Sequence, residues 1–300
     1  MPVINPNAFT GNPLDRLSEN RKDEAWVAAQ LTAENGRMVV FHKGQPLIDT
    51  DRKEPLWLSP AARSELPSDA THILLGWWND VPYSAIDASA APDQPFSDLG
   101  TYIPLRETGG LLGREELAIL GHAAWMLDWH RRHRFCARTG KPTQIRGGGV
   151  SRIEPESGTE HYPRVDPVAI VLPVKQDHCL LARGAHFPPN MYSALAGFLE
   201  PGETLEECAI REIREEVGII LTDVRYVFSQ PWPFPSSLMV GFIAQAEDWE
   251  ILLDPQEIEA ARWVEKDELA TLLGGERRED LWVPPKYAIA RQLMEVWVKE

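Results

Sequence analysis

The chain contains few cysteines, no long apolar run and no excess of positive charge. Its 300 residues include 3 cysteines, Cys136, Cys179 and Cys208. That number argues against a disulfide scaffold and favours a reducing compartment, the cytoplasm. No apolar segment approaches the roughly 20 residues that a transmembrane helix needs, and the first residues lack the basic and then apolar pattern of a signal peptide. We therefore expect a cytoplasmic protein with no membrane partner.

The charge balance opposes indiscriminate binding to polyanions. The sequence has 30 Lys and Arg against 45 Asp and Glu, a formal net charge of −15, whereas polyanion binding draws its affinity from basic patches. The basic segment 129–134 is a candidate for a local positive channel, although a cationic helix end that interacts favourably with the helix dipole is the commoner explanation. A length of 300 residues with 43% hydrophobic content predicts two domains, each with its own core.

Residues 197–219 carry the most informative pattern, G-x5-E-x7-R-E-U-x-E-E-x-G-U, in which U is aliphatic. A chance match to all of its positions is on the order of one in a million for a chain of this length. The fixed polar and glycine positions are Gly197, Glu203, Arg211, Glu212, Glu215, Glu216 and Gly218.

This spacing predicts a catalytic helix. The segment from Thr204 to about 217 consists of good helix formers, with Thr204 able to act as N-cap and Gly218 as the stop. Glu212, Glu215 and Glu216 then lie on one face. Their mutual repulsion calls for a cation, and carboxylate oxygens suit Mg²⁺ or Mn²⁺. A solvated acidic face is the usual fate of a Glu-rich run, but the glycines and Arg211 at fixed offsets favour catalysis, with Arg211 and Glu203 as an orienting pair.

The pattern resembles the Nudix box, whose family hydrolyses nucleoside diphosphates linked to a further moiety. The resemblance implies that Glu212 and Glu216 bind the metal, with Glu215 and the backbone carbonyl of Ala196 as further ligands. The general base varies across this family, and we assign that role to Glu216. Glu212, Glu215 and Glu216 are thus the expected catalytic residues.

A second motif begins at Ser229 and reads S-Q-P-W-P-F-P-S-S. Its prolines fix an extended path and its aromatic rings can stack on flat ligands, although a Pro-rich aromatic turn is often only a packed loop. Downstream of a Nudix box the motif resembles the NAD(H) pyrophosphatase branch, which releases nicotinamide mononucleotide and AMP. The resemblance implies that substrate is bound by Gln230, Pro231, Trp232, Pro233, Phe234, Pro235, Ser236 and Ser237.

Single positions can be carried over from the same resemblance. Phe198 resembles a stacking aromatic residue, and Tyr162 one that contacts nucleotide across a homodimer interface; core packing is the alternative for both. Glu257 matches an acidic position that closes the metal or substrate site, with a surface carboxylate as the alternative. Ala290 matches a small residue against the substrate, and Arg106 aligns weakly with a substrate contact.

The chain departs from this branch at its zinc ribbon. The family has four cysteines where this sequence has Phe-Cys136-Ala-Arg-Thr139-Gly and then Glu154-Pro-Glu-Ser157-Gly, so one cysteine remains. Thr139 and Ser157 are poor zinc ligands, and Glu154 with Cys136 cannot complete a closed site. His133 and His161 are the alternative ligands, although lone histidines near such a site are more often ordinary surface or core residues. We predict a ribbon that holds no zinc.

The expected fold class is α+β. A Nudix α/β/α sandwich with a mixed sheet (165–300) follows a degenerate ribbon (135–164) and a β-rich N-terminal domain (1–134). We expect antiparallel sheet over about 1–112 and a helix over about 114–133, with its apolar residues and Trp125 in the core. Strands are expected at 168–174, 178–182, 224–229 and 238–246, with a last helix from about 286.

The resemblance therefore implies a metal-dependent NAD(H) diphosphatase. Removal of NAD caps from RNA by the same hydrolysis is a related expectation. ADP-ribose or another dinucleoside diphosphate as the substrate, and an inactive dinucleotide-binding scaffold, stay open as alternatives.

Overall fold

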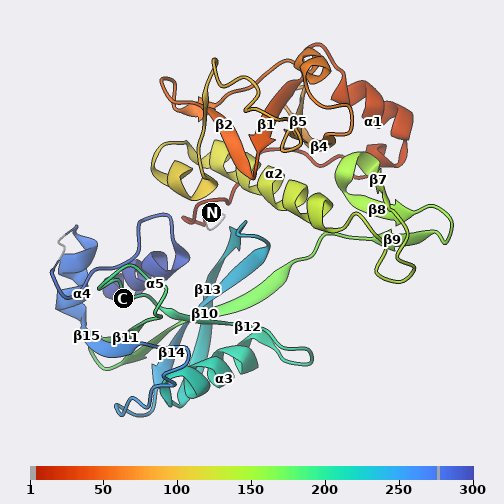
Figure 1. Cartoon of the computed structure of the whole chain (residues 1–300). Coiled ribbons are helices and arrows are strands. Elements are labelled where there is room, and N and C mark those ends of the chain that lie inside the picture. The colour runs from red at the N-terminus through yellow and green to blue at the C-terminus, as the bar shows by residue number, and fades with distance from the viewer. Residues whose placement is uncertain (1–4, 276–277) are drawn as a thin grey trace. The chain divides into compact units, whose positions relative to one another are not determined.

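The computed structural model describes residues 5–275 and 278–300 and divides the chain into two compact units (Figure 1). The N-terminal unit comprises Phe9–Arg164 and the short segment Trp232–Ser236. The C-terminal unit comprises the described residues of Val165–Pro231 and Ser237–Glu300, together with residues 5–8. In the described part of the chain no helix is both long and apolar enough to cross a membrane.

The N-terminal unit is built on a six-stranded sheet with the order β3-β2-β1-β5-β4, to which β6 adds beside β2. The strands are β1 (Arg37–His42), β2 (Gln45–Asp49), β3 (Glu54–Pro55), β4 (Thr71–Trp78), β5 (Val81–Asp87) and β6 (Thr101–Tyr102). β1 and β5 pair in parallel, so the expectation of a purely antiparallel sheet is wrong at this central pair. Short 3-10 turns lie at Asn20–Lys22, Pro60–Glu65 and Leu105–Gly110, and helix α1 covers Glu24–Leu31.

Helix α2 (Arg114–Arg132) confirms the helix predicted over 114–133. Leu117, Leu120 and Leu127 are buried in the core, as their helical spacing indicates. Trp125 is only partly buried, and its indole Nε1 donates to the carbonyl oxygen of Arg164 at 2.9 Å. Its assignment to the core was therefore wrong, because its polar edge reaches the boundary of the unit.

The ribbon segment forms a small antiparallel sheet of β7 (Gln144–Arg146), β8 (Ser151–Glu154) and β9 (Thr159–His161), with a 3-10 turn at Gly147–Gly149 between the first two strands. Ahead of β7, Cys136 begins a tight turn in which its carbonyl accepts from the Gly140 N–H at 2.8 Å. Glu154 is buried, and its carboxylate accepts from the backbone N–H groups of Glu156 at 2.8 Å and Ser157 at 3.0 Å.

The C-terminal unit has a second six-stranded sheet, with the order β13-β14-β10-β11-β15 and β12 beside β10. Its strands are β10 (Asp166–Lys175), β11 (His178–Arg183), β12 (Leu195–Phe198), β13 (Leu221–Trp232), β14 (Ser237–Ala246) and β15 (Ala260–Glu265). The central pair β10 and β14 is parallel, whereas β11 and β12 run antiparallel to β10. The sheet is therefore mixed, as expected.

Helices cover both faces of this second sheet (Figure 1). Ala169 and Val171 of β10 pack with the apolar side of α3 (Leu205–Val217). The alternate residues Ile170 and Leu172 pack with α4 (Lys266–Leu273) and α5 (Ile289–Lys299). Because successive strand residues point to opposite faces, this almost uninterrupted apolar strand supplies both cores. The predicted α/β/α sandwich is confirmed.

Candidate active site

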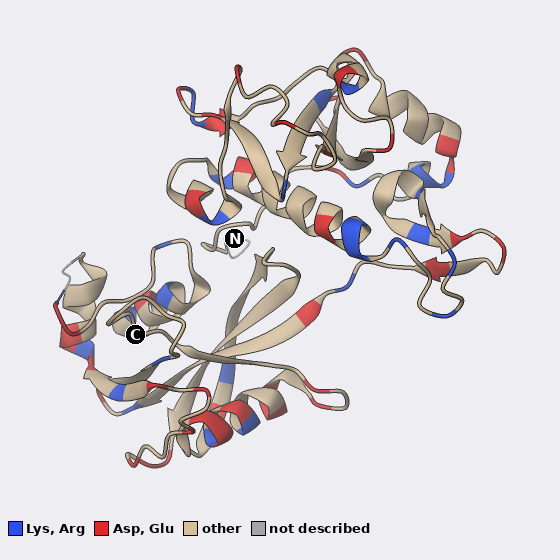
Figure 2. Ribbon diagram, in the orientation of Figure 1, with Lys and Arg blue, Asp and Glu red and all other residues tan. Residues whose placement is uncertain are grey.

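Helix α3 is fixed at both ends by its own sequence. The Thr204 hydroxyl accepts from the Glu207 N–H at 3.2 Å, and the Glu207 carboxylate accepts from the Thr204 N–H at 2.7 Å. This reciprocal pair is a capping box. Gly218 ends the helix with φ at +73°, a left-handed conformation that favours glycine. The acidic residues along α3 (Figure 2) are therefore carried on a helix with defined ends.

Arg211 is the centre of a group of charges on this helix. Its Nε donates to Glu203 Oε1 at 2.6 Å and its Nη2 to Glu203 Oε2 at 2.9 Å. Its Nη1 lies 2.8 Å from Glu212 Oε1 and 3.1 Å from Glu215 Oε2. The Nη2 also donates to the carbonyl of Phe198 at 3.0 Å, which ties the helix to β12. Hydrogen bonds from Arg211 first, and from the Glu200 N–H second, lower the pKa of Glu203 to about 2.

Glu216 has the opposite environment. It is 7% exposed, and its Oε2 has no hydrogen-bond partner in the described structure. Burial, followed by the charges of Glu212 and Glu257, raises the pKa of Glu216 to about 8. Burial likewise raises the pKa of Glu212, in spite of its contact with Arg211. The Glu215 side chain is 62% exposed and points to Arg211 and solvent. Glu212, Glu216 and Glu257 are thus coupled like charges, of which Glu216 is buried, Glu212 is partly buried and Glu257 is exposed.

Gly197 brings the backbone of β12 against this group. A Cβ atom added at Gly197 would lie 1.8 Å from Glu212 Cδ and 2.1 Å from its Oε2. Only glycine leaves space for the Glu212 carboxylate at this point. Ala196, the residue before it, is exposed and pairs with Ile170 of β10.

The arrangement fits a divalent cation. An unpartnered buried carboxylate oxygen with other carboxylates nearby is costly unless a positive charge neutralises it. Carboxylate oxygens are the donors that hard cations prefer. Within residues 5–275 and 278–300 no three acidic, imidazole or thiol groups stand in a metal-binding arrangement. Arg211 pairs with oxygens of Glu203, Glu212 and Glu215.

The second motif is divided between the two units. Gln230 belongs to the C-terminal unit and is fully buried. Its amide nitrogen donates to the carbonyls of Ala8 at 3.1 Å and Tyr287 at 2.7 Å, and its oxygen accepts from the Ile289 N–H at 2.9 Å. The partners in these three hydrogen bonds of the Gln230 amide are therefore all backbone groups. Ser237, the first residue of β14, is also buried.

Trp232 and Phe234 belong to the N-terminal unit, where both are partly buried. Their ring centroids lie 5.0 Å apart, and Phe9 packs edge-on against both at 6.4 and 5.8 Å. The guanidinium of Arg106 lies 4.4 Å from the centre of the Phe234 ring and 5.7 Å from that of Trp232, which is cation–π distance. Pro233 is buried, and Pro231, Pro235 and Ser236 are at least partly exposed.

The remaining candidate residues have different degrees of exposure. Phe198 is 60% exposed and Tyr162 is 67% exposed, so neither is a core residue. Glu257 is exposed at its own position, although its charge acts on Glu212 and Glu216. Ala290 lies in the first turn of α5 and is buried in the core.

Phe9 was missed by the sequence analysis. It contacts Trp232 and Phe234 from a position more than 200 residues away in the chain. No motif or periodicity at residue 9 signals that contact. A Cβ atom added at Gly121 would lie 2.9 Å from the Phe9 ring, so a glycine in the middle of α2 is the indirect signal that an aromatic residue packs there.

Comparison with known proteins places both units in one family. A NUDIX domain model matches residues 163–285, and a model for an NADH pyrophosphatase-like rudimentary NUDIX domain matches residues 35–129. The NAD-capped RNA hydrolase NUDT12 of Homo sapiens is 33% identical, with 98% of this chain and 73% of the relative covered. The mitochondrial NAD(P)H pyrophosphatase NUDT13 of Homo sapiens is 38% identical, with 93% and 88% covered. The NAD-capped RNA hydrolase NudC of Stutzerimonas stutzeri is 43% identical, with 60% and 61% covered.

The matched domain and the carboxylates on α3 define a hydrolase that cleaves phosphoric anhydrides. The chain belongs to the Nudix hydrolase family, in the branch of the NADH pyrophosphatases and NAD-capped RNA hydrolases. The family expected from the Nudix box and the second motif is thereby confirmed. Nudix hydrolases use divalent metal ions such as Mg²⁺ or Mn²⁺.

Proposed function

We propose that this chain hydrolyses the diphosphate of NAD(H) to nicotinamide mononucleotide and AMP. The observation that carries the proposal is the unpartnered, buried carboxylate of Glu216 beside Glu212 and Glu257, on the helix that the Nudix box forms. The names of the relatives supply the substrate, since two of them are a pyrophosphatase of NAD(P)H and a hydrolase of NAD-capped RNA.

Glu212 and Glu216 would hold the Mg²⁺ or Mn²⁺ ion, with Glu215 and the carbonyl of Ala196 as further ligands. When bound, the ion neutralises charge on the diphosphate and favours the ionised form of an attacking water. Arg211 holds one oxygen of Glu212 at 2.8 Å and leaves the other for the site. Because it also binds Glu203 through two hydrogen bonds, its guanidinium fixes the direction from which Glu212 approaches.

Glu216 is the proposed general base. Water adds to one phosphorus, the bond from that phosphorus to the bridging oxygen breaks, and the bridging oxygen leaves with the other nucleotide. One proton of the water passes to Glu216. The group has to be ionised to accept it, whereas its pKa is about 8 without bound cation. Glu216 would be ionised with a cation in the site, because the positive charge would lower its pKa.

We assign substrate contacts to the exposed and partly exposed positions Phe198, Tyr162, Trp232, Phe234, Pro231, Pro235 and Ser236, and to Glu257. Gln230, Pro233, Ser237 and Ala290 are buried, and we propose that they position the loop and the helix instead of touching substrate. For Gln230, this follows from its three contacts with backbone groups.

Product analysis tests the function. Purified protein is incubated with NADH, NAD⁺, ADP-ribose and an NAD-capped RNA, each with Mg²⁺ or Mn²⁺. The expected products from NADH are AMP and reduced nicotinamide mononucleotide. Trp232→Leu should raise KM for NADH and leave ADP-ribose hydrolysis unchanged, since ADP-ribose has no nicotinamide. Equal loss on both substrates would favour a general dinucleoside diphosphate hydrolase, and no turnover of any of them would favour a binding scaffold.

NAD-capped RNA is the second candidate substrate. Six exposed basic residues follow one another from the end of α2 to β7 (Figure 2), namely Arg131, Arg132, Arg134, Arg138, Lys141 and Arg146. Asp128, Glu156 and Glu160 pair with four of them, while Arg134 and Arg138 form no ion pair in the described structure. Replacing Arg134 and Arg138 with Gln should weaken the salt dependence of capped-RNA hydrolysis and leave NADH hydrolysis unchanged.

We further propose a cytoplasmic homodimer. Three free cysteines, all buried, suit a reducing compartment. Tyr162 is 67% exposed and its hydroxyl donates to the nearby Glu160 carboxylate, a position suited to contact with a neighbouring subunit. Sedimentation equilibrium of the wild-type protein and of Tyr162→Ala tests the dimer, and a monomeric wild-type protein would reject it.

We also propose that the ribbon folds without zinc. The Glu154 carboxylate accepts hydrogen bonds from two backbone N–H groups, so protein hydrogen bonds hold this turn. The Cys136 thiol is buried and accepts hydrogen bonds from Thr139. The bond from the Thr139 side chain contributes most to lowering the pKa of Cys136 to about 7. Zinc analysis of protein purified without chelator tests this proposal, and one zinc per chain would overturn it.

A further inference from the structure

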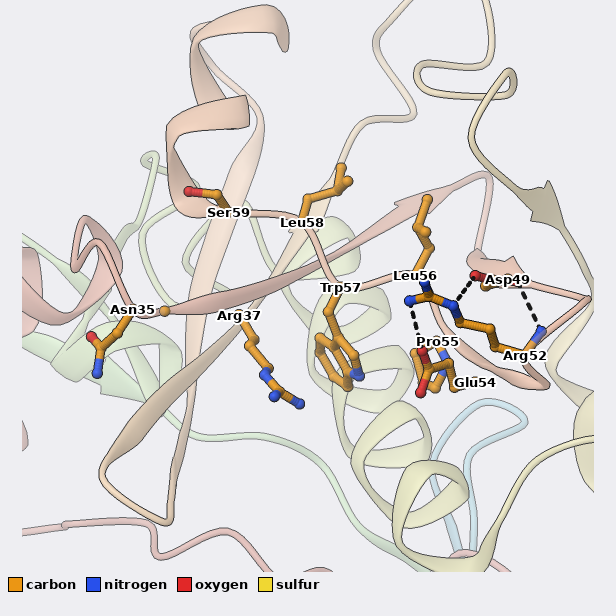
Figure 3. Close-up of a pocket in the computed structure, with 11 residues that line it drawn as sticks. Asn35, Arg37, Asp49, Arg52, Glu54, Pro55, Leu56, Trp57, Leu58 and Ser59 are labelled. Atoms are coloured by element: carbon orange, nitrogen blue, oxygen red, sulfur yellow. Dashed lines mark hydrogen bonds and ion pairs between the residues drawn. The ribbon is translucent and has the colours of Figure 1, made fainter.

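The N-terminal unit has a cavity of its own, which the Nudix helix does not line. Its volume is about 410 Å³, and Asn35, Arg37, Arg52, Glu54 and Trp57 are among the residues around it (Figure 3). The lining comes from the start of β1 and the residues before it, from the end of β2 with Asp49, from the β2–β3 turn, and from β3 and the segment that follows it. In Figure 3 the side chains of Arg37 and Trp57 project in the same direction, with the Arg52 and Glu54 pair on the far side of Trp57.

Backbone hydrogen bonds fix Arg37 beside Trp57. The N–H of Met38 donates to the Leu58 carbonyl at 2.8 Å, and the Leu58 N–H donates to the Met38 carbonyl at 2.9 Å. These two hydrogen bonds hold Arg37, which precedes Met38, and Trp57, which precedes Leu58, as neighbours. Tyr83 lies beneath both of them, since Arg37 lies opposite it in the β1–β5 register and Trp57 contacts its ring at 5.0 Å. The cavity wall is therefore part of the sheet and not a loose loop.

Arg37 is a cation without a counter-ion. Its guanidinium lies 5.7 Å from the centre of the Tyr83 ring, and none of the described carboxylates forms an ion pair with it. Arg52 differs, because it lies 3.7 Å from a carboxylate oxygen of Asp49 and 3.7 Å from one of Glu54. At this end of the cavity a phosphate would meet a positive charge that no protein group already neutralises.

Trp57 and Glu54 supply two further kinds of contact. The planes of Trp57 and Tyr83 are 87° apart, so this edge-to-face contact covers at most one of the two indole faces. Trp57 is partly exposed. The Glu54 side chain is 46% exposed, and its one ion-pair contact is long at 3.7 Å, which leaves oxygens able to accept from an amino group. A cation, a flat aromatic surface and an acceptor thus follow one another along the cavity.

We propose that this cavity binds a nucleotide, with its phosphate at Arg37, its base on Trp57 and an amino group of the base at Glu54. The site is additional to the Nudix site, and the proposal does not depend on NAD(H) hydrolysis. Adenine, cytosine and guanine carry the required amino group, whereas uracil has none. AMP, a product of the proposed reaction, contains all three parts.

Photo-crosslinking locates the site directly. The full-length protein with Mg²⁺ is irradiated with radiolabelled 8-azido-AMP and digested with trypsin, and the labelled peptides are sequenced. Label is expected in the peptide 54–63, which contains Trp57, in addition to any label in residues 165–300. Unlabelled AMP should compete for that peptide, and about tenfold more UMP should be needed for the same competition, since one hydrogen bond is lost.

Three variants complete the experiment. Arg37→Gln, at an exposed position, should reduce labelling of peptide 54–63 by about tenfold, and Trp57→Leu should reduce it similarly. Lys53→Gln is the matched control, because it removes an adjacent exposed charge that does not line the cavity; trypsin then releases Trp57 in peptide 53–63, whose labelling should equal that of peptide 54–63 in the wild type. NADH turnover by Arg37→Gln should equal that of the wild type.

Label confined to residues 165–300, or equal labelling of peptide 54–63 in Arg37→Gln and the wild type, would overturn the proposal. If the wild-type protein did not turn over NADH, that result would reject the proposed hydrolysis and leave the proposal of the nucleotide site untouched.

Discussion

Arg211 binds both carboxylate oxygens of Glu203, through Nε at 2.6 Å and Nη2 at 2.9 Å. The two residues are 8 positions apart, on either side of the start of α3. A planar guanidinium can span the carboxylate and still reach Glu212 and Glu215, whereas an ammonium group cannot. The pair therefore transmits the position of the preceding loop to the carboxylates of the site.

Arg211→Lys should lower kcat by about 10- to 100-fold, because Lys retains the charge and loses the two-point contact. Thermal unfolding should change little in comparison. Arg214→Lys is the matched control on the same helix, since Arg214 is exposed and forms no ion pair in the described structure. Equal kcat values for both variants would mean that Arg211 contributes charge alone.

Glu216→Gln should lower kcat by about 10²- to 10⁴-fold, because it removes the proposed base and one metal ligand. Circular dichroism and thermal unfolding should show that the fold persists, since Gln is of nearly the same size. Glu206→Gln, an exposed change in the first turn of α3, should leave the rate unaltered. A near-normal rate for Glu216→Gln would remove Glu216 from the mechanism.

The metal-free protein should lose stability as the pH rises from about 4.5 to about 8. The pKa of Glu216 is raised from 4.5 to about 8 in the folded chain, so the unfolded chain releases this proton first. The contribution of Glu216 to the free energy of unfolding is fully present below the unfolded-state pKa of 4.5. It is lost as the pH rises through the folded-state pKa of about 8. Thermal unfolding in chelator should show this slope, and Glu216→Gln should have a flatter one. Added Mg²⁺ should raise Tm more at pH 8 than at pH 6, and an equal rise would contradict the assignment.

Gly197→Ala should abolish most activity with little loss of stability. The new Cβ would lie 1.8 Å from Glu212 Cδ, and a flexible carboxylate can move away at low cost. That movement takes Glu212 out of the site. Gly202→Ala is a poor control because φ there is +100°; Ala196→Ser, on the same strand, leaves the space beside Glu212 open. We expect kcat for Gly197→Ala to fall by at least tenfold while Tm stays near that of Ala196→Ser.

The sequence predicted what depends on neighbours along the chain. Thr204, Glu207 and Gly218 define the ends of α3 through local hydrogen bonds and a left-handed turn, and the structure has the helix between these residues. β10 was expected from its apolar run and is present. The N-terminal sheet was less predictable, because the parallel pairing of β1 with β5 depends on a crossover and not on a hairpin.

Contacts between distant segments were beyond the sequence analysis. Gln230 reads as a polar residue in a loop, yet Ala8, Tyr287 and Ile289 surround its amide. Phe9 carries no motif and packs on Trp232 and Phe234. Burial of this kind is decided by tertiary packing, which neither periodicity nor spacing encodes.

The caps of α3 have a consequence for the supply of metal in the cell. Thr204 and Gly218 determine where the helix begins and ends without any help from a ligand, so the proposed ligands Glu212 and Glu216 keep their spacing whether or not an ion is bound. Under that proposal, replacement of one divalent cation by another would require no refolding. Selection among hard cations rests on geometry, ligand type and metal availability, so the ion in the proposed site would follow the supply of magnesium and manganese without the making of new protein.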